Sequence, residues 1–397
     1  MSEAIRVPYN YLPMQFADYS EIAARWDALI KTADFTLGAF MEQFEREFAD
    51  YIGSPHCLAT NNGTDALILA LKALGIGPGD EVITPCNSFY ATTGAIVAVG
   101  ATPVFCDVDE RFQADVNDMD RRVTPRTKAL LPVHWGGASP DMAKVMDLAQ
   151  SHGLLVLEDA CMAIGGKVHG KSPGTFGDMG AFSMHPLKTL NVMGDGGMVI
   201  TKDGDRMRWM LKYRNHGMVD RDHIDMWGVN MRLQPLQAVV ASNMLTSLDE
   251  RLVRRREIQR TYDEQLGALG PSIVVPPRAE WNPETVSLYM FQADNRDDLI
   301  AHLVANGVEA KVHYPVPLHL QKPGREMGYG PGDMPGAEAQ ADRLITLPAH
   351  EYLDYAQVDL VISRLRAHSG LPRMKVGLAS QVSGPIDRDP LIYLKCK

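Results

Sequence analysis

The sequence predicts an α/β fold in which helices cover a largely parallel β-sheet. Short apolar runs of strand length alternate with segments of helical periodicity between about residues 40 and 200. The chain has 397 residues, of which 45% are hydrophobic and 22% are charged, as is usual for a globular enzyme. A chain of this length can bury a large core and divide into more than one domain.

The expected elements follow one another in a regular order. A helix over 41–52 is indicated by apolar residues at helical spacing, namely Met41, Phe44, Phe48 and Tyr51. The expected strands are short and buried, and they cover 81–85, 102–107, 129–134 and 154–158. Two further helices are expected over 63–74 and 140–152, the second ending at Gly153.

The last third of the chain has a different pattern. One long helix is expected over 233–265, with a stripe formed by Leu236, Val239, Val240, Met244 and Leu248. A proline-rich stretch over 271–284 follows it. We therefore expect a large domain over 1–250 and a smaller C-terminal domain over 251–397. Residues 371–397 show little periodicity and are interpreted as a tail or an added strand.

Charge and cysteine content exclude several classes of function. The net charge of −10 argues against nucleic-acid binding, which needs a basic face. No apolar run approaches the roughly 20 residues that cross a bilayer, and the first residues do not resemble a signal peptide. We expect a cytoplasmic protein. The scattered cysteines form no CxxC pair, so we assign no metal ligands and expect buried thiols.

Residues 61–66, with the sequence NNGTDA, form the first candidate site segment. Gly63 lets the backbone approach a ligand closely. Thr64 offers a hydroxyl at a helix start, where free N–H groups attract an anion such as phosphate. The alternative is that Asn62 or Thr64 only caps the helix.

An acidic pair ends the apolar run over 154–157 and forms the second segment. Ligands of open α/β sheets bind beyond the carboxyl ends of the strands, so Asp159 is expected to face a site crevice. A buried carboxylate needs a partner, and a protonated ring nitrogen is a suitable one. The alternative is that this acid caps the following segment.

Lys188 is the centre of the third segment, AFSMHPLKTL over 181–190, which precedes a glycine-rich stretch over 194–197. A lysine between apolar residues loses its proton more easily, as a Schiff-base lysine must. Ser183 adds a second hydroxyl for phosphate, and His185 is interpreted as structural. The alternative is a surface lysine on a turn.

The order of the three segments favours one cofactor. A phosphate loop, an acid at a strand end and a lysine near a hydroxyl are the parts that pyridoxal 5′-phosphate (PLP) needs, and no common alternative cofactor needs all three. Over roughly residues 30–370, the sequence then resembles the fold-type-I, PLP-dependent sugar aminotransferases of the DegT/StrS kind. The matching stretches include NNGTDALILALKALGIGPGDEVITP, GATPVFCDVD, LEDACMAIGG, GTFGDMGAFSMHPLKTL, GDGGMV, RNHG, WGVNMRLQPLQA and HYPVPLHLQ.

This resemblance implies a fold and a set of cofactor ligands. The fold is a large domain with a mixed, mostly parallel seven-stranded sheet flanked by helices, and a smaller C-terminal α/β domain. Lys188 carries PLP as a Schiff base, and Asp159 pairs with the pyridine nitrogen. The phosphate is held by Gly63, Thr64, the backbone of Asp65, and Ser183.

The resemblance also assigns residues around the ring and the substrate. Phe89, rather than Tyr90, matches the aromatic residue that stacks on the pyridine. Asn230 matches a residue that reaches the phosphate of the neighbouring subunit, which implies a homodimer with shared active sites. Tyr314 and His319 match a segment that lines the substrate side.

Two positions depart from the pattern of the family. Met162 stands where a glutamine near the phenolic oxygen of the cofactor is usual, and a thioether cannot donate a hydrogen bond. Met162 is therefore expected beside the ring, holding it less firmly or altering its electronics. Ile164 stands where many members carry a polar residue, and we expect an apolar wall of the substrate site there.

The resemblance implies transfer of an amino group from glutamate or glutamine to a keto-sugar, often nucleotide-linked. The amine of Lys188 then moves the proton between the donor Cα and the cofactor. A sugar dehydratase branch replaces this lysine with histidine, so the presence of Lys188 disfavours it. Two rivals stay open: a PLP enzyme that eliminates or epimerises, and a regulator that binds PLP or a sugar without turnover.

Overall fold

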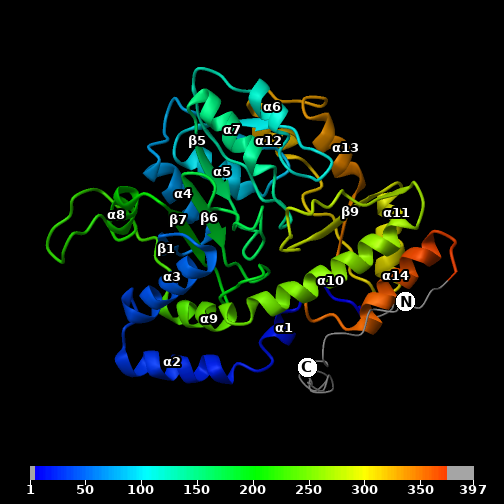
Figure 1. Ribbon diagram of the computed structural model, residues 1–397, viewed down its shortest axis with the longest axis horizontal. Coiled ribbons are helices and arrows are strands. Elements are labelled where there is room, and N and C mark those ends of the chain that lie inside the picture. The colour runs from blue at the N-terminus through cyan, green and yellow to red at the C-terminus, as the bar shows by residue number, and fades with distance from the viewer. Residues whose placement is uncertain (1–4, 373–397) are drawn as a thin grey trace.

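A seven-stranded mixed sheet forms the centre of the protein in the computed structural model, which describes residues 5–372 (Figure 1). The order is β1-β7-β6-β5-β4-β2-β3. The strands are β1 (His56–Thr60), β2 (Glu81–Pro85), β3 (Thr102–Cys106), β4 (Thr127–Leu130), β5 (Leu155–Asp159), β6 (Met179–Ser183) and β7 (Gly197–Thr201). Neighbours from β3 to β6 pair in parallel, whereas β7 is antiparallel to both β6 and β1. The mixed, mostly parallel sheet expected from the resemblance is confirmed.

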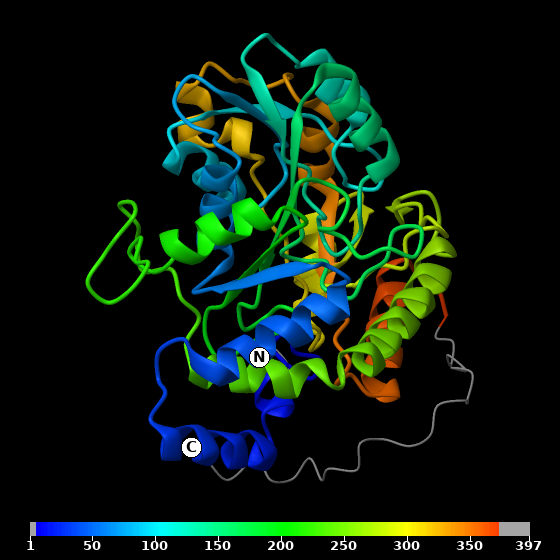
Figure 2. The same ribbon diagram turned by 60° about the vertical axis from the view of Figure 1, so that its left-hand side comes forward.

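Helices cover both faces of this sheet. Side chains alternate along each strand, so Leu58 and Val199 enter one core while Cys57 and Ile200 enter another. The first face carries α4 (Gly63–Ala73), α5 (Tyr90–Ala98) and α8 (Gly204–Tyr213). The opposite face carries α2 (Ser20–Thr32), α3 (Gly38–Ile52), α6 (Val116–Arg121), α7 (Met142–His152) and α9 (Pro235–Leu245). Figure 2 shows α3 and α9 side by side below the sheet.

A second, smaller unit follows in the chain and has its own core. Its antiparallel sheet has the order β10-β9-β8 and consists of β8 (Ile273–Val274), β9 (Tyr289–Ala293) and β10 (Leu344–Leu347). The helices packed around it are α10 (Leu248–Gly267), α11 (Arg296–Ala305) and α14 (Tyr355–His368). Val7, from the other end of the chain, is fully buried in the same core.

Short helices lie in the connections between the larger elements. They are α1 (Leu12–Gln15), η1 (Leu318–Leu320), α12 (Lys322–Glu326) and α13 (Pro335–Arg343). Leu318 and Met334 pack against Phe105 of β3, so the segment between β9 and β10 returns to the edge of the large sheet. The division near residue 250 stays a prediction, and residues 373–397 of the expected tail lie outside the described residues.

The single helix expected over 233–265 is wrong, because the helix ends at Leu245 and a new one begins at Leu248. The hydroxyl of Thr246 donates to the carbonyl of Asn243 at 2.7 Å. Serine and threonine make such local bonds in competition with the helix ladder. Leu236, a member of the expected stripe, is 42% exposed. The break lets α10 turn away from α9 toward the C-terminal unit (Figure 1).

Candidate active site

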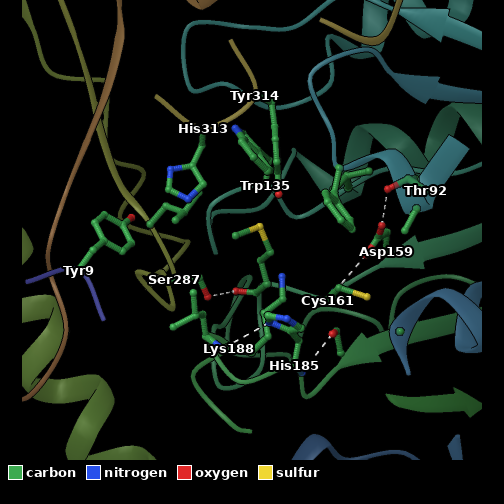
Figure 3. Close-up of a pocket in the computed structure, with 18 of the residues that line it drawn as sticks. Tyr9, Thr92, Trp135, Asp159, Cys161, His185, Lys188, Ser287, His313 and Tyr314 are labelled. Atoms are coloured by element: carbon green, nitrogen blue, oxygen red, sulfur yellow. Dashed lines mark hydrogen bonds between the residues drawn. The ribbon is translucent and has the colours of Figure 1, made fainter. Parts of the chain in front are cut away.

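A cavity of about 280 Å³ lies where the carboxyl ends of the central strands meet the C-terminal unit. Its walls include Asp159 at the end of β5, Ser183 at the end of β6 and Gly63 at the start of α4. Tyr314 and His350 contribute walls from the C-terminal part of the chain. Figure 3 shows Lys188, Asp159 and Tyr314 around this space. The location is the one at which open α/β sheets bind ligands.

Asp159 is a buried carboxylate that lacks an ion pair with any described residue. Its side chain is 5% exposed. Its Oδ2 accepts a hydrogen bond from the Thr92 hydroxyl at 2.7 Å, and its Oδ1 accepts one from the Cys161 amide at 3.1 Å. The bond from Cys161 is the local cap that the sequence offered as an alternative. A buried anion held only by neutral donors is suited to a cationic ligand such as a protonated ring nitrogen.

Glu158, the neighbouring acid, uses both of its carboxylate oxygens in contacts within the protein. It is completely buried and accepts bonds from the amides of Gly174, Phe176 and Gly177 at 2.7–2.8 Å. Its Oε2 also lies 2.9 Å from His134 Nε2. Successive residues of a strand point to opposite faces, so only one of the two acids reaches the cavity.

Lys188 faces the cavity from the loop between β6 and β7. Burial lowers the pKa of its ammonium, while the nearby Cys161 thiol and Asp159 carboxylate act in the opposite direction. Desolvation penalises the charged form of an amine, so a larger fraction of Lys188 is neutral than of an exposed lysine. The structure brings this amine and Asp159 to one cavity, as the sequence analysis required.

The start of α4 and the end of β6 form a cradle for an anion. Gly63 and Thr64 line the cavity at the N-terminus of α4, and Ser183 lies beside them. A Cβ added to Gly63 would lie 2.7 Å from the Cβ of Ser183, so the close approach requires glycine. Free N–H groups at a helix N-terminus favour a phosphate at this position.

Helix capping and ligand binding coexist at this cradle. Asn62 is the N-cap of α4, and its Oδ1 accepts the amide hydrogen of Asp65 at 2.8 Å. Asp65 does not line the cavity, since its amide and its carboxylate both pair with Asn62. The capping alternative therefore describes Asn62 and Asp65, whereas Gly63 and Thr64 remain directed at the cavity.

Aromatic side chains build the wall opposite the lysine. Phe89 lines the cavity, whereas Tyr90 does not. Tyr314 lies between Phe89 and Trp135, with ring centroids 5.6 Å and 4.9 Å away. The backbone of Tyr314 has a φ of 56°, a left-handed conformation that is unusual for a bulky residue. Such strain is common where a side chain is aimed at a ligand.

Met162 lines the cavity as expected, but Ile164 does not. The carbonyl of Met162 accepts a hydrogen bond from the Ser287 hydroxyl at 2.5 Å, which ties this segment to the C-terminal unit. Ile164 is 1% exposed and lies in the core between the large sheet and α3. The expectation that Ile164 forms a wall of the substrate site is therefore wrong, because its side chain packs in this core and not in the cavity.

His319 and Asn230 lie apart from the cavity of their own chain. His319 is completely buried, and its Nε2 lies 3.0 Å from the Glu338 carboxylate, between η1 and α13. Asn230 is exposed and accepts a bond from Arg232 at 3.0 Å. It belongs to the loop after α8, which projects from the sheet in Figure 1. Trp227 of this loop is 89% exposed.

Several residues that line the cavity were not identified from the sequence. Thr92 is one of them, and its position one helical turn after Phe89 is the signal that could have identified it. Tyr9 and Tyr11 precede the stretch of family resemblance, which begins near residue 30, and gave no signal. The remaining unforeseen lining residues include Trp135, Cys161, Ser287, His313 and His350.

Two histidines of the cavity are neutral at neutral pH. Burial lowers the pKa of His313 to about 4, assisted by the positive charge of Lys311. Burial also lowers the pKa of His350 to about 4. Neutral imidazoles offer hydrogen bonds without adding charge. The carboxyl groups of Asp159 and Asp195, the amine of Lys188 and the guanidinium of Arg255 also line the cavity.

The residues of this cavity fit PLP. The cradle at Gly63 is suited to a phosphate, the carboxylate of Asp159 to a pyridinium nitrogen, and the amine of Lys188 to a carbonyl carbon. Within residues 5–372, no cluster of three histidine, cysteine or acidic side chains could hold a metal ion. Over the same residues, no helix combines the length and the apolar character needed to cross a membrane.

Comparison with known proteins gives full-length matches. The model of the DegT/DnrJ/EryC1/StrS aminotransferase family matches residues 17–366. A UDP-N-acetyl-3-dehydro-α-D-glucosamine 3-aminotransferase of Acidithiobacillus ferrooxidans is 38% identical over 92% of this chain and 99% of its own. A pleiotropic regulatory protein of Geobacillus stearothermophilus is 37% identical over 91% of this chain and 98% of its own.

Solved structures give the same result. DesV of S. venezuelae, in complex with a ketimine intermediate, has a TM-score of 0.87 and 37% identity, covering 92% of this chain and 99% of its own. NtdA of Bacillus subtilis, with bound cofactor PMP, has a TM-score of 0.86 and 28% identity, covering 93% of this chain and 86% of its own. The fold-type-I architecture expected from the sequence is confirmed.

Proposed function

The chain belongs to the DegT/DnrJ/EryC1/StrS aminotransferase family, and from this premise we propose that it transfers an amino group from glutamate or glutamine to a keto-sugar, with the cofactor carried by Lys188. The protein is a PLP-dependent aminotransferase of sugars. One observation supports the assignment of roles: an amine of lowered pKa lines the same cavity as a buried carboxylate that has no ion pair within the described part of the chain.

PLP supplies an electron sink that stabilises negative charge at the carbon of the donor that loses its proton. Lys188 would hold the cofactor through its Nζ and would be released from it when the donor binds. The freed Nζ then takes the proton from the donor Cα, because burial favours its neutral form. Its attachment to a loop at the cavity wall keeps this base close to the reacting carbon, which supplies much of the rate.

Asp159 acts at the other end of the ring. Its carboxylate, oriented by Thr92 and the Cys161 amide, keeps a proton on the pyridine nitrogen. Gly63, Thr64 and Ser183 bind the phosphate. Phe89 stacks on the ring and excludes water from one face.

The acceptor is proposed to be a keto-sugar joined to a nucleotide. This proposal is supported by the substrates in the names of relatives, such as the UDP-linked sugar of the Acidithiobacillus ferrooxidans enzyme. Tyr314 and Trp135 offer an aromatic wall against which a sugar ring can pack. The amino donor is proposed to be either glutamate or glutamine. Residue His319 is proposed to support the substrate segment from behind, through Glu338.

The proposal includes a cytoplasmic homodimer with shared active sites. It is supported by Asn230, which lies on a projecting loop away from its own cavity. The same loop exposes Val219, Ile224 and Trp227, and exposed apolar residues grouped on a loop are typical of an interface. Asn230 of one subunit would then bind the phosphate held by the other.

Borohydride reduction followed by peptide mass spectrometry tests the role of Lys188. The cofactor mass is expected on the peptide that contains Lys188 and on no other. The Lys188→Ala variant should bind PLP and lose turnover. Full activity of that variant, or cofactor fixed on another lysine, overturns the assignment.

A spectroscopic half-reaction separates this function from its rivals. Glutamate or glutamine, added without acceptor, should convert the bound cofactor into the pyridoxamine form with release of the keto acid. A regulator without turnover remains the second candidate, because Met162 removes a usual cofactor contact and one relative is named a regulatory protein. No spectral change with any amino donor would favour that candidate or an eliminating or epimerising enzyme.

A further inference from the structure

The backbone of Lys188 is held on both sides. Its N–H donates to the carbonyl of His185 at 2.8 Å. Its carbonyl accepts two hydrogen bonds, from the Tyr11 hydroxyl at 3.1 Å and from the Asn191 amide at 3.2 Å. A carbonyl has two lone pairs, so this one is fully used. The base of a long, flexible side chain is thereby fixed.

A reciprocal pair of amides orients Asn191. Gln15 Nε2 donates to Asn191 Oδ1 at 3.1 Å, and Asn191 Nδ2 donates to Gln15 Oε1 at 3.0 Å. Both side chains are buried, with 8% and 0% exposure. The amide of Asn191 cannot rotate without breaking both bonds. Gln15 therefore acts on Lys188 through Asn191 and itself touches neither the lysine nor the cavity.

Tyr11 and Gln15 belong to one segment, residues 6–15, which we call the strap. The first part of the strap, residues 7–9, is hydrogen-bonded to the C-terminal unit. The Val7 amide donates to the Gly307 carbonyl at 3.0 Å, and the Tyr9 amide donates to the Glu309 carboxylate at 2.7 Å. His350 donates from Nε2 to the carbonyl of Pro8 at 3.0 Å. The strap thus joins the C-terminal unit to the lysine loop of the large sheet.

The surroundings of Tyr11 keep its hydroxyl a donor. The side chain is 4% exposed, and its ring stacks on Tyr352 with centroids 5.8 Å apart. The guanidinium of Arg255 lies 5.1 Å from the ring centroid. Burial raises the pKa of the Tyr11 phenol above its usual value, and Arg255 opposes this only in part. The hydroxyl therefore keeps its proton near neutral pH.

We propose that the strap positions Lys188 and that Tyr11 is a positioning residue of the reaction. It acts through the lysine backbone and touches no reacting atom of Lys188. The inference rests on the proposed function, because it concerns the lysine that carries the cofactor. A side chain with four rotatable bonds returns its Nζ to the same place only if its Cα is fixed. Misplacement of a catalytic group by about 1 Å can cost on the order of a hundredfold in rate.

The test compares Tyr11→Phe with Tyr352→Phe. Both variants lose one phenol hydroxyl from the same aromatic cluster, but only the first loses the bond to Lys188. The first readout, without any substrate, is the pH titration of the absorbance of the lysine-bound cofactor. We expect its midpoint to move by about half a unit or more in Tyr11→Phe, the effect of one lost hydrogen bond. We expect no such movement in Tyr352→Phe.

Steady-state kinetics provide the second readout. For Tyr11→Phe, kcat should fall about tenfold with little change in KM for the sugar, because the wall of Tyr314 and Trp135 is unchanged and the ring at position 11 is kept. Equal effects of both variants would show that the aromatic cluster matters and not the bond, which overturns the proposal. An unchanged midpoint together with unchanged kcat in Tyr11→Phe overturns it as well.

A second variant keeps the test decisive if Tyr11→Phe does not fold. Gln15→Met retains the volume but releases the amide of Asn191, so the cofactor titration should move in the same direction as for Tyr11→Phe. An unmoved titration in folded Gln15→Met counts against the strap. The wild-type titration separates the two proposals: no lysine-bound cofactor in the wild type refutes the proposed function and the strap together, whereas a normal wild type with unaffected variants refutes the strap alone.

Discussion

Thr92 donates a 2.7 Å hydrogen bond from its hydroxyl to the Oδ2 oxygen of Asp159. Both side chains are almost completely buried, with 1% and 5% exposure. The bond joins the first turn of α5 to the end of β5, and it directs the carboxylate toward the cavity (Figure 3). The sequence identified the acid but not this partner.

The first prediction concerns this bond. Thr92→Val keeps the shape and removes the donor, which leaves one oxygen of a buried carboxylate unpaired at a cost of about 1–3 kcal/mol. We expect kcat/KM to fall on the order of tenfold and the cofactor to bind more weakly. The matched control is Thr93→Val, because the buried Thr93 hydroxyl has no hydrogen-bond partner among residues 5–372. If both variants behave alike, Thr92 does not orient Asp159.

The second prediction concerns the phosphate cradle. Gly63→Ala places a Cβ 2.7 Å from the Cβ of Ser183 and narrows the space at the start of α4. The affinity of the apoprotein for PLP, measured by absorbance titration, should fall by about tenfold or more. Gly94→Ala is the control, because an added Cβ there meets no atom within 4 Å. Unchanged affinity in Gly63→Ala would place the phosphate elsewhere.

The third prediction concerns Met162, which lines the cavity. Met162→Gln supplies an amide that can donate to the phenolic oxygen of the cofactor, so PLP should bind about threefold to tenfold more tightly, the gain of one net hydrogen bond. The absorbance maximum of the bound cofactor should move with it. Met162→Leu, which restores no donor, should match the wild type in both measurements. Equal behaviour of all three proteins would remove any special role for this position.

The fourth prediction concerns pH and stability. His350 has a pKa of about 4 in the folded protein and near 6.5 when unfolded. Below pH 6.5 the unfolded state binds a proton that the folded state does not, so the free energy of unfolding should fall as the pH drops from 6.5 to 4. Urea unfolding at a series of pH values measures this. His350→Gln should flatten the dependence, and a slope equal to that of the wild type would contradict the assignment.

The fifth prediction concerns the shared site. As homodimers, Lys188→Ala should be inactive and Asn230→Ala weakly active. When the two are unfolded together and refolded at equal amounts, half of the dimers are mixed, and one of their two sites is free of both changes. About a quarter of the wild-type activity is therefore expected to return. No recovery in a verified mixed dimer would show that Asn230 serves its own subunit.

The sequence was sufficient for features that depend on strand ends and short spacing. Asp159 and Lys188 were predictable because a parallel strand leads its last residue to a known edge, and a lysine among apolar residues marks a buried loop. Two expectations of other origin failed. The one for Ile164 came from the resemblance, and its side chain packs in the core instead. The long helix over 233–265 was expected from apolar spacing, which gives no sign of the break after Leu245.

Long-range contacts were beyond the sequence for another reason. Tyr11 and Lys188 are 177 residues apart, and Thr92 and Asp159 are 67 residues apart. No periodicity reports a bond over such separations, because each partner is an ordinary residue of its own segment. His319 illustrates the opposite error: its motif resembled a substrate segment, yet packing places it in the interior with Glu338.

The adjacency of Glu158 and Asp159 makes the catalytic centre intolerant of insertions or deletions in β5. A slip of the strand by a single residue would turn the Glu158 carboxylate, which anchors three backbone amides, toward the cavity and would turn the Asp159 carboxylate away from it. Exchanging glutamate and aspartate at these two positions preserves composition and net charge, yet it changes the reach of each acid by one methylene. For anyone redesigning this enzyme, the register of β5 is thus as critical as the identity of the two acids.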